Sequence, residues 1–123
     1  AIVICVQCKA DKYGVAYKNL GNEVKGVLSA RGCSFTIDPT KADYVIKINA
    51  TARKHAHSTV GKTTTYFAYV DASISITNKK SQRIYEDVIS VKGGSINYEL
   101  AANDAYKKVS KQIGGAVSEN IEL

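Results

Sequence analysis

Two alternating strands joined by a short turn, and followed at once by a helix, dominate the second half of this chain. Apolar and polar residues alternate over Tyr66–Thr77 and, less regularly, over Arg83–Lys92, with Asn78–Ser81 between them. This alternation predicts strands that bury one face, and the polar tetrapeptide predicts a hairpin turn. Gly93 and Gly94 then lead into an alanine-rich segment with apolar residues at helical spacing. The order restricts the chain to folds in which a helix packs on an antiparallel sheet.

The first half of the chain predicts one more helix and three more strands. Ala1–Cys8 is almost uninterruptedly apolar, which favours a buried strand. Apolar residues recur at helical spacing over Val15–Arg31, and Gly32 follows where a glycine commonly ends a helix. Cys33–Ile37 is a short strand candidate, and Ala42–Arg53 alternates as a half-buried strand does.

These elements give the order β-α-β-β-β-β-α within the α/β (α+β) class. The 123 residues suffice for one hydrophobic core. We therefore expect a single domain over residues 1–123, built as a two-layer sandwich. A mixed, mostly antiparallel sheet would form one layer, and two helices on one face would form the other.

Three finer expectations concern the ends and irregularities of the elements. The polar segment Lys54–Lys62 predicts a long hairpin connection. A bulge near Glu86 and Asp87 would reconcile the broken alternation of the fifth predicted strand, Arg83–Lys92. Ser95 or Asn97 could cap the last helix, because both residue types accept hydrogen bonds from the first helical N–H groups.

The cysteines favour buried side chains over a metal or redox site. Cys5 and Cys8 fall in a predicted strand, where positions three apart point to opposite faces, and no second Cys-x-x-Cys follows. Cys33 could form a disulfide with Cys5 or with Cys8 in an oxidising compartment.

The sequence carries no constellation for catalysis. His55 and His57 share one face of an extended segment, which is a metal-ligand geometry, but zinc requires three or four ligands and no carboxylate or thiol lies nearby. A Gly-x-Ser-x-Gly elbow is absent, and Gly61-Lys62-Thr63 lacks the earlier glycine of a phosphate-binding loop. We therefore expect no enzyme activity, no catalytic residue, no metal and no cofactor. A small hydrolase or a metal-dependent enzyme that uses both histidines is a rival hypothesis.

The face of the long strand that points away from the helices is the candidate partner-binding surface. Phe67 and Tyr69 point outward there, and Tyr85 could lie beside them. Because an open sheet face is normally polar, aromatic residues on it indicate a partner or a homo-oligomer. The predicted hairpin adds the second group of candidates: Arg53, Lys54, His55, His57 and Lys62.

The net charge of +6 leaves two alternatives open. It could be an ordinary basic surface, or it could attract nucleic acid or another acidic partner. The 17 Lys and Arg residues are scattered along the chain, which argues against nucleic acid as the partner. A small cytoplasmic nucleic-acid-binding domain remains the alternative function, and no small-molecule substrate is expected.

Several segments resemble envelope domains related to the amino-terminal domain of TolB. Ala42–Ile46 resembles their strand entry "AD-Y-V-I", and Tyr69–Asn78 resembles the long strand that follows. Ser81–Tyr85 stands where those proteins have "TGeivys", and Gly93–Ser95, followed by Ala101, Ala102 and Ala105, resembles the start of their last helix. Within that group the chain is similar to LpoB-like and CsgG-like lipoprotein domains, FlgT and small outer-membrane lipoproteins. The acid and glycine of the family's "DxxTG" turn are missing from Asn78–Gln82.

This resemblance implies a non-enzymatic binding or assembly module that docks onto other envelope proteins. It implies a protein in the periplasm or anchored to the outer membrane. The chain has no methionine and opens directly on a hydrophobic strand, which we expect of a longer precursor whose signal segment has been removed.

Overall fold

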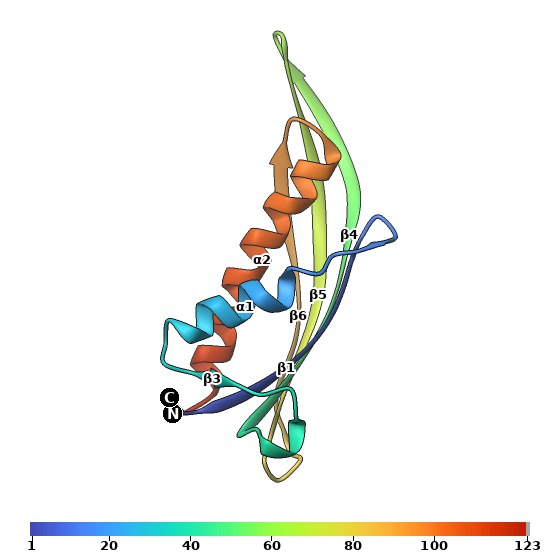
Figure 1. Cartoon of the computed structure of the whole chain (residues 1–123). Coiled ribbons are helices and arrows are strands. Elements are labelled where there is room, and N and C mark those ends of the chain that lie inside the picture. Colours follow the sequence, from blue (N-terminus) through green and yellow to red (C-terminus); the bar gives the residue numbers. More distant parts are fainter. Residues whose placement is uncertain (123) are drawn as a thin grey trace.

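The computed structural model, which describes residues 1–122, has two layers: a curved sheet and two helices packed on one of its faces (Figure 1). The strands are β1 (Val3–Lys12), β2 (Val15–Ala16), β3 (Ser34–Phe35), β4 (Tyr44–Val60), β5 (Thr63–Asn78) and β6 (Arg83–Ser95). The helices are α1 (Leu20–Ser29), the short 3-10 helix η1 (Pro39–Lys41) and α2 (Tyr98–Asn120). The predicted fold class is confirmed.

The sheet has the order β2-β1-β4-β5-β6, and β3 pairs separately with β1. β1 runs parallel to β4 and β3, while the β4–β5 and β5–β6 pairs are antiparallel. A parallel pair needs a long crossover connection, and α1 with the segment after it supplies that crossover between β1 and β4. The sheet is therefore mixed and mostly antiparallel, as the sequence predicts.

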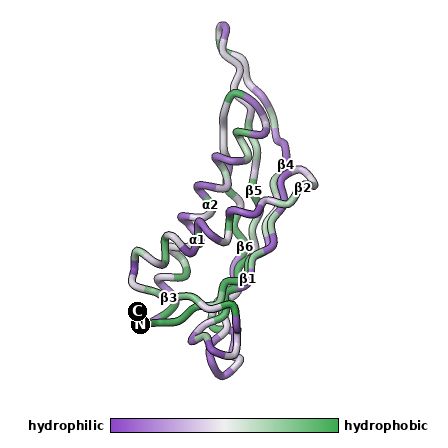
Figure 2. The backbone as a smooth tube through the Cα atoms, viewed as in Figure 1, coloured by the Kyte–Doolittle hydropathy of each residue, from purple (hydrophilic) through white to green (hydrophobic). Residues whose placement is uncertain are grey.

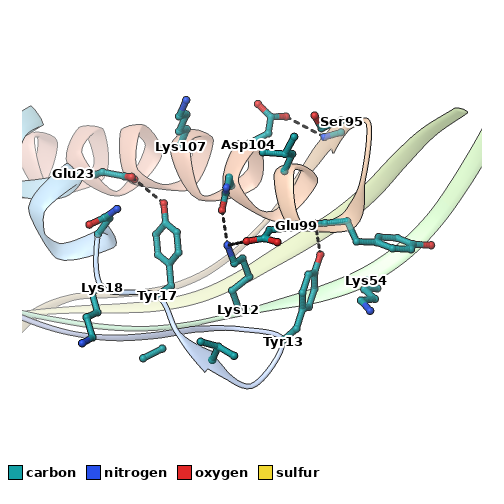
Figure 3. Close-up of a pocket in the computed structure, with 17 residues that line it drawn as sticks. Lys12, Tyr13, Tyr17, Lys18, Glu23, Lys54, Ser95, Glu99, Asp104 and Lys107 are labelled. Carbon is teal, nitrogen blue, oxygen red and sulfur yellow. Dashed lines mark hydrogen bonds and ion pairs between the residues drawn. The ribbon is translucent and has the colours of Figure 1, made fainter. Parts of the chain in front are cut away.

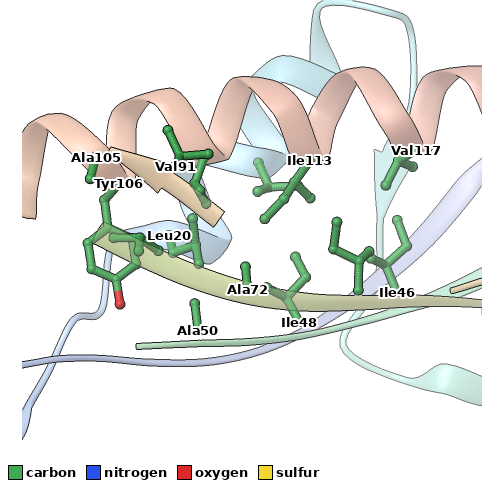
Figure 4. Close-up of a cluster of buried hydrophobic side chains, with 14 of the residues drawn as sticks. Leu20, Ile46, Ile48, Ala50, Ala72, Val91, Ala105, Tyr106, Ile113 and Val117 are labelled. Carbon is green, nitrogen blue, oxygen red and sulfur yellow. The ribbon is translucent and has the colours of Figure 1, made fainter. Parts of the chain in front are cut away.

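One face of the sheet and the two helices enclose the core (Figure 4). The sequence pattern assigns eleven alternating residues to the inner face. Tyr44 packs half-buried against the core, and the other ten are buried: Ala42, Ile46, Ile48, Ala50, Ala52, Ala68, Val70, Ala72, Ile74 and Ile76. Figure 2 shows the same division along the backbone, with hydrophobic stretches of the strands beneath the helices. None of the helices within residues 1–122 is both long enough and apolar enough to span a membrane.

The first helix begins later than its sequence pattern predicts. Val15 and Ala16 form β2, which folds back on β1 through Tyr13 and Gly14, both at positive φ (53° and 86°). Two central residues at positive φ are typical of a tight hairpin turn that matches the twist of the strands. The predicted glycine stop is confirmed, because Gly32 has a φ of 88° just after α1.

The irregularity in β6 lies nearer the turn than predicted. Ile76 pairs with Tyr85 and Thr77 with Arg83, so the extra residue is Ile84, not Glu86 or Asp87. With the bulge at Ile84, Tyr85 faces the helices and packs half-buried against the core. The prediction that Tyr85 lies on the open face is therefore wrong. The cap predicted for the last helix is Asn97, whose Oδ1 accepts from the Leu100 N–H at 2.8 Å.

Asp43, just before β4, forms hydrogen bonds with the beginning of β1. Its backbone N–H donates to the Val3 carbonyl at 2.7 Å, and its Oδ2 accepts from the Val3 N–H at the same distance. Its Oδ1 lies 2.7 Å from the Lys79 Nζ in the β5–β6 turn. This carboxylate thus ties together three segments that are distant in sequence.

Asp43 should make the stability of the fold depend on pH. The Lys79 ammonium, and then the Val3 N–H, hold the pKa of Asp43 below its ordinary value. A carboxyl with a lower pKa in the folded chain stabilises it above the unfolded pKa, about 4, and that stabilisation is lost as the pH falls through the folded pKa. We expect Asp43→Asn to lower the free energy of unfolding at pH 7 and to have a smaller effect at pH 3. Urea denaturation at both pH values tests this, and an equal effect at both would contradict it.

Candidate functional site

The β4–β5 hairpin extends beyond the rest of the sheet as an arm, which we define as residues 53–66 and which is two-stranded over residues 58–65 (Figure 1). β1 pairs with β4 only as far as Ala52, and β6 pairs with β5 only as far as Tyr66. The connection predicted over Lys54–Lys62 is wrong, because β4 continues to Val60 and only Gly61 and Lys62 form the turn. Gly61 takes a φ of 61°, which a tight hairpin turn favours.

A bulge at the base of the arm separates the two histidines. The pairing register shifts between Lys54 and Ala56, so the extra residue is His55. The His55 ring meets Tyr69 edge-on at 4.9 Å, whereas the His57 ring lies 5.7 Å from Tyr66. The two imidazoles therefore belong to different clusters, and the single face expected for them is wrong. Within residues 1–122, no group of three or more His, Cys, Asp or Glu side chains could hold a metal ion.

The open face at the base of the arm carries aromatic rings covered by cations. The Arg53 guanidinium lies 4.5 Å from the centre of the Tyr69 ring, and the Lys92 ammonium lies 4.8 Å from that of Phe67. Both rings are half-buried. Such cation–π contacts contribute about 0.5–1 kcal/mol each at exposed sites. Sequence reasoning missed Lys92, which lies 25 residues from Phe67 along the chain and meets it only because β5 pairs with β6.

Asp71 fixes the position of Arg53. Its Oδ2 accepts from the Arg53 Nε at 2.8 Å, and its Oδ1 accepts from the Ser90 hydroxyl. The Arg53 guanidinium and then the Ser90 hydroxyl lower the pKa of Asp71, while the Asp71 carboxylate raises the pKa of Arg53. Both groups stay charged at neutral pH, so the guanidinium is held over the Tyr69 ring.

The helix-covered face at the base of the arm borders an open groove of about 1110 Å³ (Figure 3). The β1–β2 hairpin and the first turns of α2 form its walls. The Lys54 ammonium lies 5.2 Å from the Tyr13 ring centre and 5.5 Å from that of Tyr98. The Tyr13 hydroxyl donates to the Tyr98 carbonyl at 2.7 Å. These contacts join the arm, the hairpin and α2.

Polar side chains deeper in the groove bind one another. The Lys12 Nζ donates to the Asn103 Oδ1 at 3.0 Å and pairs with Glu99 at 3.4 Å. The Tyr17 hydroxyl donates to the Glu23 Oε1 at 3.0 Å, and burial followed by that hydrogen bond raises the pKa of Tyr17 to about 12. Tyr17 therefore keeps its proton at neutral pH and acts as a donor, not as a base.

The three cysteines are free thiols, and the predicted separation of two of them is confirmed. The Cys5 Sγ contacts the Ile37 carbonyl, whereas the Cys8 Cβ lies beside Gly21 of α1. Cys5 and Cys33 are buried as predicted, whereas Cys8 is exposed, so the prediction of a buried side chain is wrong at that position. Desolvation by neighbouring atoms raises the pKa of Cys8 and of Cys33. A raised pKa disfavours the thiolate, which is the reactive form.

The eight residues singled out by sequence fall into four places. Arg53, His55, Phe67 and Tyr69 gather on the open face at the base of the arm. Lys54 and His57 contact tyrosines near α2, and Lys62 occupies the exposed turn. Tyr85 lies elsewhere, on the helix-covered face. The site that the structure brings together thus consists of the arm and its base.

Solved structures with a similar fold include two bacterial lipoproteins. A minor lipoprotein from Acinetobacter baumannii has a TM-score of 0.70 at 18% identity, over 96% of this chain and 91% of that one. The rare lipoprotein B from Shewanella oneidensis has a TM-score of 0.65 at 10% identity, over 95% and 94%. The protein CT253 from Chlamydia trachomatis has a TM-score of 0.57 at 10% identity, over 97% and 99%. No family model and no curated protein matches the sequence.

Proposed function

We propose that this chain is a non-enzymatic binding module of the bacterial envelope, and that it docks onto a protein partner through its arm. The projection of the arm beyond β1 and β6, over residues 58–65, is the observation that carries the proposal. Residues 58–63 of this two-stranded ribbon are exposed, so the ribbon buries little of its own surface. Its length is therefore better explained by a partner than by the core.

The composition of the arm suits a partner with acidic groups. Residues 53–66 contain no Asp or Glu, whereas Arg53, Lys54 and Lys62 lie among them. Beyond Ala52 the outer edge of β4 has no neighbouring strand among residues 1–122. An unpaired strand edge can hydrogen-bond an extended segment of another protein. The arm thus offers a partner backbone groups, cations and the rings of Phe67 and Tyr69.

The envelope location rests on two separate supports. The solved structures of similar fold include bacterial lipoproteins. The strand and helix segments that resemble TolB-related envelope domains fall on β4, β5, β6 and α2. We therefore propose a periplasmic or outer-membrane-anchored protein, related to the LpoB-like, CsgG-like and FlgT group.

Capture from a bacterial envelope extract tests the proposal. The purified chain should retain a specific envelope protein, identified by mass spectrometry, and a Phe67→Ala/Tyr69→Ala variant should lose most of it. Lys47→Ala, an exposed substitution on the same sheet face away from the arm, should retain it. Circular dichroism must show that both variants are folded.

Two outcomes would contradict the proposal. If the double variant captures the partner as well as the wild type, the base of the arm is not the docking surface. If the chain captures only nucleic acid that moderate salt releases, the basic residues serve phosphate binding and the alternative function replaces this one.

A further inference from the structure

The outer edge of β6 carries backbone groups that no strand within residues 1–122 pairs with. In an antiparallel pair, alternate residues direct their N–H and C=O groups toward the neighbouring strand or away from it. The Val88 N–H donates to the Asp87 Oδ1 at 2.8 Å, and the Gly94 N–H donates to the Asp104 Oδ2 at 3.0 Å. Both N–H groups therefore point away from β5. By alternation, the even-numbered residues of β6 direct their backbone groups outward.

Side chains of α2 cover the end of this edge that lies nearest the arm. The Asp104 carboxylate accepts a hydrogen bond from the Gly94 N–H, and the Lys108 Nζ donates to the Lys92 carbonyl at 3.4 Å. The bulge at Ile84 interrupts pairing at the other end. Native sheets use such charged side chains and bulges to prevent unwanted strand pairing. The stretch between these two features, Glu86–Ser90, has no such cover from α2.

This uncovered stretch is centred on an exposed valine. The Val88 side chain is 71% exposed and lies on the open face, where the neighbouring positions on β5 are serines. An exposed β-branched residue in the middle of a free strand edge favours pairing with another strand.

We propose that a second copy of this chain pairs with β6 in antiparallel orientation, with the two-fold axis at Val88. Val88 then lies opposite its own counterpart, and Glu86 lies opposite Ser90 of the second copy. An axis at Glu86 or Asp87 would place identical carboxylates opposite each other, which destabilises a strand pair.

The same register also brings opposite charges together. Glu86 becomes the diagonal neighbour of Lys92 of the second copy, and the two-fold axis repeats this contact. A two-fold axis at Ile89 would place Lys92 opposite Glu86 of the second copy, so the Lys92 carbonyl would have to accept a hydrogen bond from that strand. The Lys108 Nζ already donates to this carbonyl. The Val88 N–H must leave the Asp87 carboxylate to join the new pair. The two sheets become continuous, and the two arms point in opposite directions, free for the docking proposed above.

Disulfide trapping of the full chain tests both the pairing and its register. Cysteines are introduced singly in a Cys8→Ser background, because Cys8 is the exposed native thiol. Residues opposite each other in a hydrogen-bonded pair have Cα atoms about 5.5 Å apart, within the range of a disulfide. Val88→Cys should therefore form a covalent dimer readily under mild oxidation. Ile96→Cys is the control for random collision, because Ile96 is 74% exposed and lies off the edge.

The register gives a second, independent result. Glu86→Cys and Ser90→Cys should each fail to crosslink alone but should crosslink when the two variants are mixed. In sedimentation experiments without oxidant, Val88→Lys should weaken dimerisation by about tenfold or more, because it places two ammonium groups opposite each other.

The inference is wrong if Val88→Cys crosslinks no faster than Ile96→Cys, or if the wild type stays monomeric at every concentration. Efficient crosslinking of Ile89→Cys instead would overturn the register. None of these results depends on whether the arm binds an envelope protein.

Discussion

Replacing Gly93 by alanine should destabilise the fold by about 3 kcal/mol or more, and it should prevent α2 from docking in its present position. A Cβ at Gly93 would lie 2.3 Å from the Ala101 carbonyl oxygen and 2.4 Å from the Ala105 nitrogen. Both are backbone atoms of α2, so no side chain can rotate away and the whole helix must move off the sheet. The φ of Gly93 is not positive, so the effect is one of packing alone.

Gly115→Ala is the matched control for this prediction. Gly115 lies within α2, and a Cβ there would meet no heavy atom within 4 Å. Alanine should stabilise this helix position by about 1 kcal/mol, because glycine has a poor helix propensity. Urea denaturation of the wild type, Gly93→Ala and Gly115→Ala should show a lower free energy of unfolding for the first variant and a higher one for the second. Nearly equal stabilities of Gly93→Ala and the wild type would show that α2 does not approach β6 this closely.

The case of Gly93 shows what the sequence could and could not predict. The pair Gly93-Gly94 is visible as a break between a strand and a helix, but β6 continues through both residues to Ser95. The physical reason for Gly93 is the close approach of α2, a contact between residues eight or more positions apart. A tertiary contact of this kind leaves no periodic signal, whereas the inward alternation of β4 and β5 does.

The arm and the first hairpin escaped prediction for related reasons. Over residues 55–65 both faces of the ribbon meet solvent, so the burial that produces alternation is missing there. Tyr13 occupies a positive-φ turn position where Asn, Asp or Gly would have been a recognisable signal. Its place is explained only by its contacts with Lys54 and Tyr98.

The candidate site was predicted in part. Phe67 and Tyr69 follow from simple alternation along β5, and the structure places them on the open face. A single extra residue, His55, then decides which side of the sheet each histidine occupies, and the bulge at Ile84 likewise turns Tyr85 inward. Because side chains in a strand alternate with a period of two, one unrecognised bulge reverses every later assignment.

Tyr106→Ala should destabilise the fold by about 4 kcal/mol, within the range measured for removing a large buried aromatic side chain. Tyr106 is fully buried and stacks on Tyr17 with ring centres 4.0 Å apart and an interplanar angle of 8°. Its hydroxyl donates to the Asp11 carbonyl at the end of β1. One side chain of α2 thus supports the strand end and the tyrosine that lines the groove.

Tyr106→Phe separates the two contributions of this side chain. It keeps the buried ring and the stacking but removes the hydrogen bond, so a loss of only about 1 kcal/mol is expected. Denaturation curves for both variants measure the difference. If the phenylalanine variant loses as much stability as the alanine variant, the bond to Asp11 outweighs the ring. The contact between α2 and the end of β1 would then depend on a hydrogen bond rather than on packing. The same would hold for the wall of the groove beside the arm.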